Sequence, residues 1–195
     1  MYISVMSISE EVIFMLKFSG ITQKNNIIGI DIDVYVPLTI EWRSYNSSYV
    51  IYWRSGDLKK SLIEVGLHGL TGNIASLTLT QVSRVDLVGK QKTYSDFENV
   101  EIVNGSPVFN IDDWSTAGSV DNLSKEIEMI DEKIDFLVIL SENYISILFD
   151  ERKEPKKIIK SGNVLFEITD NDYLSKIHVL NLSPDEYRVL LEAIK

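Results

Sequence analysis

The segment Ser61–Val82, SLIEVGLHGLTGNIASLTLTQV, decides how the rest of the chain is interpreted. Two apolar-rich runs, Leu62–Leu67 and Ile74–Val82, flank a segment that contains Gly and Asn. In each run the apolar residues recur at every second position, which is the periodicity of a strand with one buried face. A Gly- and Asn-containing segment between two such runs is typical of a turn. The segment therefore predicts a β-hairpin.

Composition restricts the class of protein. The chain has 195 residues, 45% hydrophobic and 25% charged, as expected for one folded domain spanning residues 1–195. It contains no cysteine, which excludes a disulfide scaffold, a thiolate metal site and a cysteine nucleophile. The first residues lack the basic and apolar regions of a signal peptide, and the apolar runs are too short to cross a bilayer. We therefore expect a cytoplasmic protein without membrane contact.

The negative charge is concentrated in the second half of the chain. The formal net charge is −10, and residues 1–90 balance eight basic against eight acidic residues. Residues 94–151 carry fourteen acidic residues and two lysines. Such a region can be a solvated face, or it can attract a basic partner through its field. Direct nucleic-acid binding is disfavoured, because phosphate contacts require a concentrated basic surface.

The remaining pattern predicts an α+β fold of mostly antiparallel sheet in two β-rich halves, residues 1–82 and 135–182. An amphipathic helix is expected over Ser119–Ile134, and a C-terminal helix after the capping pattern Ser183–Glu186. The two halves do not repeat each other's residues convincingly, so the sequence does not predict a duplication. The further expected strands are Val12–Leu16, Ile27–Val36, Thr39–Arg43, Tyr49–Arg54, Phe136–Leu140, Tyr144–Phe149, Lys156–Lys160, Val164–Ile168 and Ile177–Leu182.

No catalytic motif is present. The two histidines, His68 and His178, lie outside any Gly-x-Ser-x-Gly pattern, so we interpret them as ordinary turn and strand residues. Asp31 and Asp33 would share a strand face, and paired carboxylates can hold a metal or divide acid and base roles. A hydrolase that combines Asp31 and Asp33 with His178 therefore remains an alternative. We predict neither a cofactor nor a metal.

Aromatic residues are dense between positions 42 and 53. In the predicted strand Tyr49–Trp53, Ile51 and Trp53 face one side and Tyr52 faces the other. One side is expected to pack in the core across neighbouring strands. The other could form an aromatic interface or line a small-molecule pocket, which keeps a ligand-binding or structural β-domain open as a second alternative.

Several stretches resemble immunity proteins of bacterial polymorphic-toxin and contact-dependent growth inhibition systems. SLIEVGLHGLTGNIASLTL is similar to their S-L-I-E-[IV]-G strand, T-G turn and S-[IL]-T-L strand. Asn104–Phe109 followed by Trp114 resembles their G-x-P-V-F…W stretch, and Asp135-Phe136 and Leu182–Glu186 add to the likeness. The resemblance implies a cytoplasmic, non-catalytic protein that neutralises a cognate toxin C-terminal domain by tight binding.

A basic nuclease domain would suit the acidic middle of this chain. We expect carboxylates to imitate phosphate and an aromatic side chain to anchor the contact, while strand addition to a sheet edge is a second possible mode. The candidate partner-binding residues are Asp112, Asp113, Trp114, Glu142, Tyr144, Asp150 and Glu151.

Overall fold

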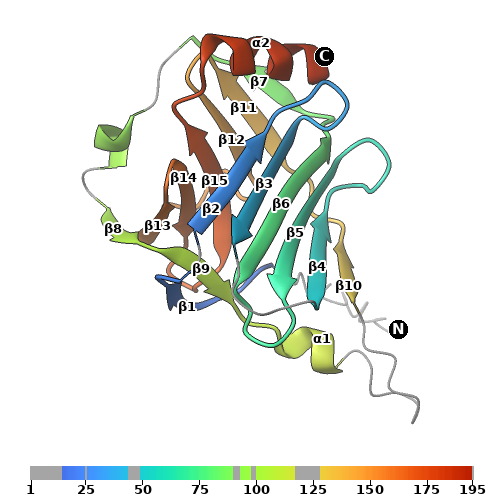
Figure 1. Ribbon diagram of the computed structural model, residues 1–195, viewed down its shortest axis with the longest axis vertical. Coiled ribbons are helices and arrows are strands. Elements are labelled where there is room, and N and C mark those ends of the chain that lie inside the picture. Colours follow the sequence, from blue (N-terminus) through green and yellow to red (C-terminus); the bar gives the residue numbers. More distant parts are fainter. Residues whose placement is uncertain are drawn as a thin grey trace, which may run out of the picture.

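Two β-sheets face each other, and a helix closes one end of the pair (Figure 1). The computed structural model describes residues 15–24, 26–43, 49–89, 93–97, 100–116 and 128–194. The mostly antiparallel sheet and the C-terminal helix are thereby confirmed. The strand predicted over Val12–Leu16 lies largely outside the described residues.

The first sheet has six strands in the order β10-β4-β5-β6-β3-β2. Neighbours are antiparallel except β10, which runs parallel to β4. The predicted hairpin is present, because β5 and β6 pair through the turn at residues 69–73. The strands are β2 (Asn26–Asp31), β3 (Leu38–Arg43), β4 (Val50–Ser55), β5 (Leu62–His68), β6 (Ile74–Gln81) and β10 (Met129–Glu132).

The second sheet has seven strands in the order β7-β11-β12-β15-β14-β13-β8. The edge strands β7 and β8 are parallel to their neighbours, and the inner pairs are antiparallel. A separate antiparallel pair joins β1 (Phe18–Thr22) to β9 (Ser106–Phe109). The seven strands are β7 (Val85–Leu87), β8 (Glu101–Asn104), β11 (Leu137–Ser141), β12 (Tyr144–Leu148), β13 (Lys157–Ser161), β14 (Val164–Ile168) and β15 (Leu174–Leu180).

The two sheets repeat one strand order. The order β2-β3-β6-β5-β4 in the first sheet matches β11-β12-β15-β14-β13 in the second, and a parallel strand follows the last member in each. At the ends of β4 and β13, Arg54-Ser55-Gly56 matches Lys160-Ser161-Gly162. Ser55 pairs with Ile63 and Ser161 pairs with Val164, so Ile63 corresponds to Val164. The sequence does not predict this repeat, because so few aligned positions are alike. The structure shows it through topology.

One hydrophobic core lies between the sheets and includes residues of both. Trp42 on β3 packs on Phe166 of β14, and its indole Nε1–H donates to Ser161 Oγ at 2.9 Å. Trp53 packs edge-on against Phe149. The prediction that one side of the aromatic strand is core is therefore confirmed. Tyr52 is half-buried on the opposite, outer face of the six-stranded sheet.

The helices agree with the sequence only in part. α2 (Pro184–Ala193) begins at Ser183 with the predicted capping box. The middle helix is wrong at its C-terminal end, because residues 129–132 form β10 and pair with β4. Residues 117–127 lie outside the described residues. Two short helices, η1 (Tyr94–Phe97) and α1 (Asp112–Thr116), precede them, and no helix in the described ranges has the length and apolarity needed to span a bilayer.

Candidate functional site

Three of the predicted partner-binding residues lie together on α1. The Asn110 side chain shapes the start of this helix, since its Oδ1 accepts from Asp112 N at 2.7 Å and its Nδ2 donates to Asp112 Oδ2 at 3.0 Å. Asp112 is exposed, Asp113 is half-buried and Trp114 is only 8% exposed. The two carboxylates therefore reach the surface, whereas the Trp114 ring belongs mainly to the interior.

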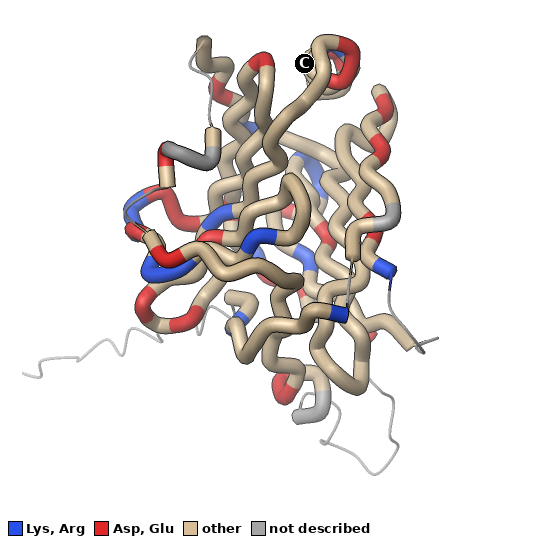
Figure 2. Tube along the Cα trace, turned by 60° about the vertical axis from the view of Figure 1, so that its left-hand side comes forward, with Lys and Arg blue, Asp and Glu red and all other residues tan. Residues whose placement is uncertain are grey.

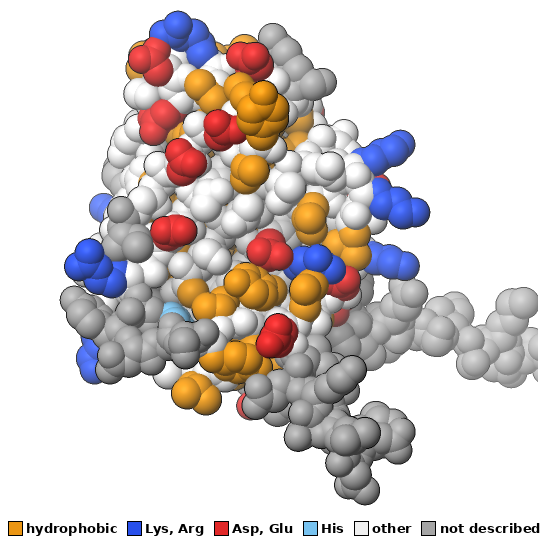
Figure 3. All heavy atoms as spheres, turned by 45° about the vertical axis from the view of Figure 1, so that its right-hand side comes forward, with side chains coloured by type: hydrophobic (Ala, Val, Ile, Leu, Met, Phe, Trp, Pro, Cys, Tyr) orange, Lys and Arg blue, Asp and Glu red, His pale blue; other side chains and the backbone are white. Residues whose placement is uncertain are grey.

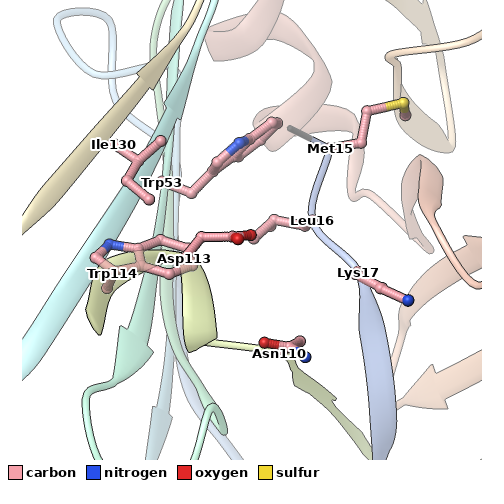
Figure 4. Close-up of a pocket in the computed structure, with 8 residues that line it drawn as sticks. All are labelled: Met15, Leu16, Lys17, Trp53, Asn110, Asp113, Trp114 and Ile130. Carbon is pink, nitrogen blue, oxygen red and sulfur yellow. The ribbon is translucent and has the colours of Figure 1, made fainter. Parts of the chain in front are cut away.

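A small pocket separates α1 from β4, β10 and the segment before β1 (Figure 4). Its volume of about 10 Å³ fits one water molecule. The indoles of Trp53 and Trp114 and the Asp113 side chain border this space, while the Lys17 amine points away from it. Trp114 Nε1 has no hydrogen-bond partner among the described residues. The pocket can hold a solvent-sized polar group but not a drug-sized ligand.

Further carboxylates lie on segments that are linked to the α1 pocket through Trp53 or its strand. Trp53, which borders the α1 pocket, also contacts Phe149, and Asp150 and Glu151 follow Phe149 directly. Arg84 joins Glu151 and Asp135 with two ion pairs of 3.2 Å. Arg54 on β4 binds Asp131 at 2.7 Å. We call this set the acidic rim: Asp112, Asp113, Asp131, Asp135, Asp150 and Glu151.

Basic residues gather elsewhere. Lys153, Lys156, Lys157 and Lys160 lie on β13 and the segment before it, at the opposite side of the seven-stranded sheet from β7. Figure 2 views the side that carries β8 and β13, where basic and acidic segments alternate. Figure 3 views another side of the molecule, on which hydrophobic side chains are interspersed with charged ones. Acidic residues are thus also present on these two sides of the molecule.

Glu142 and Tyr144 lie apart from the acidic rim. Glu142 is exposed in the turn between β11 and β12, at the other end of β12 from Asp150, so the two are separated by on the order of 20 Å of strand. The Tyr144 side chain is 8% exposed and packs in the same cluster as Phe97 of η1. Burial, aided by the charge of Asp96, raises the pKa of Tyr144. Asp112, Asp113 and Trp114 therefore lie together on α1 and Asp150 and Glu151 lie together after β12, whereas Glu142 and Tyr144 lie apart from both groups.

The structure also contains a buried polar array that the sequence analysis missed. Ser146 Oγ lies 2.6 Å from His178 Nδ1, and His178 Nε2 lies 2.8 Å from Glu167 Oε1. Lys176 Nζ is 2.9 Å from Glu167 Oε2, forming an ion pair although Oε2 accepts no well-directed hydrogen bond. Burial raises the pKa of Glu167, but the hydrogen bond from His178 and the charge of Lys176 outweigh it and hold that pKa below its ordinary value.

The array is closed to substrates in this structure. Ser146 and His178 are each 1% exposed, and the Phe97 ring lies over the imidazole with 5.4 Å between ring centroids. The residue types are those of a nucleophile, a base and an acid, yet a nucleophile must reach its substrate. An acid within the otherwise apolar run Val164–Ile168 was the sequence signal for this array.

The residues of the hydrolase alternative do not lie together. Asp31 pairs with Thr39 at the edge of the six-stranded sheet, whereas His178 lies on the outer side of the seven-stranded sheet beneath η1. No group of three or more possible metal ligands occurs within the described part of the chain. A surface depression of about 410 Å³ lies beside residues 153–156, 170 and 171, and charged and polar residues predominate in its lining.

Comparisons with known proteins do not assign the chain to a family. No protein-family model matches the chain, and no curated protein matches it.

Proposed function

We propose that this protein is a bacterial immunity protein, which binds a cognate toxin C-terminal domain in the cytoplasm and blocks its active site. In this proposal the toxin is a nuclease with a basic substrate cleft, and the immunity protein acts by binding without catalysis. The resemblance of the β5–β6 hairpin sequence to immunity proteins gives the class. The acidic rim gives the contact surface.

The observation that carries the proposal is the set of carboxylates in the acidic rim. They come from three separate segments: α1, the β10 region and the residues after β12. Asp112 and Glu151 are exposed, whereas Trp53 is buried. A surface of this kind imitates the spaced negative charges of a nucleic-acid backbone. It would attract a basic cleft from a distance and then occupy it.

The buried aromatics modify the expected contact. Trp114 and Tyr144 are each 8% exposed, so neither offers its ring to a partner in the present conformation. The proposal therefore assigns the affinity mainly to charge and to the shape of α1. Electrostatic contacts of this type increase the association rate and make it sensitive to salt.

The test is binding of the purified protein to the toxin C-terminal domain encoded next to it, measured by calorimetry at low and high salt. Asp112→Lys and Glu151→Lys should each weaken binding by about tenfold or more, because a basic cleft would meet a repulsive charge. Asp170→Lys is the matched control, since Asp170 is an exposed acid outside the acidic rim. It should bind like the wild type.

The outcomes separate the mechanisms. Tight, salt-sensitive binding that the rim variants weaken supports the proposal. If binding is tight and neither salt nor the rim variants change its affinity, the immunity function is retained but the contact lies at a sheet edge. If the toxin domain does not bind at all, the proposed function is wrong.

A further inference from the structure

The edge strand β2 differs from its equivalent in the repeated topology. In the second sheet the matching strand, β11, is covered along its outer edge by β7, with Val138 paired to Val85. In the first sheet β2 is the end of the order, and within the described ranges β3 is the neighbour with which it pairs. Uncovered strand edges are templates for another strand. The fold therefore contains two equivalent strand edges, and β7 covers the one at β11.

Several features make β2 the most receptive edge. It has six residues, with a register shift between Ile27 and Gly29, whereas the other edge strands of the two large sheets, β7, β8 and β10, have three or four residues. Ile27 and Ile30 point to the core side, opposite Trp42 and Ile40, but remain only half-buried. At Gly29 an added Cβ would meet nothing within 4 Å, so the space beside this residue is open.

The charges along this edge have opposite signs at its two ends. Arg43 is paired with Asn26 at the start of β2, and Asp31 ends the strand. Both side chains are exposed, and neither belongs to an ion pair within the described residues. A partner strand that ran antiparallel to β2 and carried the same charges would therefore bring opposite signs together at both ends.

We propose that β2 is the contact edge of a symmetric dimer, in which β2 strands of two copies pair antiparallel. Placing Asn26 opposite Asp31 of the second copy also places Ile27 opposite Ile30 of that copy, on the shared core side. Arg43 then lies about 10 Å, two strand spacings, from Asp31 of the second copy, within the combined reach of the two side chains. The two six-stranded sheets become one continuous sheet, and the contact occurs twice by symmetry.

The test is a charge exchange read by sedimentation velocity and light scattering of the full chain across the micromolar range. Wild type should show a concentration-dependent dimer. Asp31→Lys or Arg43→Glu alone should raise the dissociation constant about tenfold or more, since each creates two like-charge contacts. An equimolar mixture of the two variants should dimerise again, because the introduced lysine of one copy meets the introduced glutamate of the other while the native pair forms at the second contact.

Matched controls are Asp170→Lys and Arg152→Glu, which make the same charge changes away from β2. They should dimerise like the wild type, and all variants should keep the wild-type melting temperature when it is measured below the concentration at which the wild type dimerises. A monomeric wild type overturns the inference, as does a dimer that the exchange leaves unaffected. Protection of β2 amides from hydrogen exchange only when toxin is added would assign this edge to a toxin strand instead. The inference does not depend on the proposed function, because sedimentation and light scattering test the dimer without toxin.

Discussion

Replacing Lys176 with Met should destabilise the protein by leaving Glu167 with one partner fewer. The Glu167 side chain is 4% exposed, and Lys176 Nζ lies 2.9 Å from its Oε2. Breaking a buried ion pair by removing one partner costs on the order of 3–5 kcal/mol. His178 still holds Oε1 at 2.8 Å, so we expect the lower part of that range or slightly less, about 2–3 kcal/mol.

The complementary change, Glu167→Gln, should cost less. Glutamine keeps a carbonyl oxygen for His178, and Lys176 retains its 16% exposure and a hydrogen bond to Lys153 O at 3.3 Å. We expect about 1–2 kcal/mol for this variant. The double variant removes both charges together and should therefore be more stable than the sum predicts by about 1–2 kcal/mol.

Urea unfolding followed by the fluorescence of the buried Trp42 and Trp53 measures the four free energies of this cycle. Additivity within about 0.5 kcal/mol would refute the reasoning, because it would mean that the two side chains do not interact. A pH series gives a second readout. The pKa of Glu167 lies below its ordinary 4.5, so its stabilisation is present above that value and is lost as the pH falls through the folded-state pKa. In Lys176→Met the loss should begin at a higher pH.

Three further predictions concern single residues. Ser161→Ala should cost about 1–3 kcal/mol in urea unfolding, because the buried Trp42 Nε1–H loses its acceptor, and in a Trp42→Phe background the same change should cost measurably less. Burial lowers the pKa of His68 below 6.5, so the unfolded chain protonates first and stability falls below that pH by at most about 1.4 kcal/mol per pH unit; His68→Leu should flatten this part of the profile. Three backbone N–H groups, those of Lys60, Lys59 and Ser61, hold the pKa of Asp57 at about 2, so Asp57→Ala should lower the melting temperature at pH 7 and have little effect near pH 2.

Local patterns predicted the elements better than their assembly. Alternation identified the β5–β6 hairpin, and the capping pattern identified α2, because both are encoded by neighbouring residues. The C-terminal end of the predicted middle helix was wrong. Ile127, Ile130 and Ile134 fit helical spacing, but Met129–Glu132 pair with β4 and therefore form a strand. A pairing partner more than seventy residues away leaves no local signal.

The candidate site was predictable only in its charge. Acidic density located Asp112, Asp113, Asp150 and Glu151, but the pocket that Asp113 shares with Trp53 depends on the fold. Exposure could not be predicted either, since Trp114 is equally compatible with a core or a surface position. The buried polar array was not predicted for the same reason. Glu167 lies among apolar residues, and its partner His178 is defined by the pairing of β14 with β15.

The strand order also determines when the core can close during synthesis. Strands β2 to β6 all lie within residues 26–81, but the residues that cover their inner face come largely from residues 136–182. At the usual rate of translation, residues 82–182 take on the order of 5–20 s to make. For that time Ile40, Ile63 and Leu77 face solvent or another chain. Chains that stop before β11 should therefore aggregate, and only the completed second half turns the first into a protected sheet.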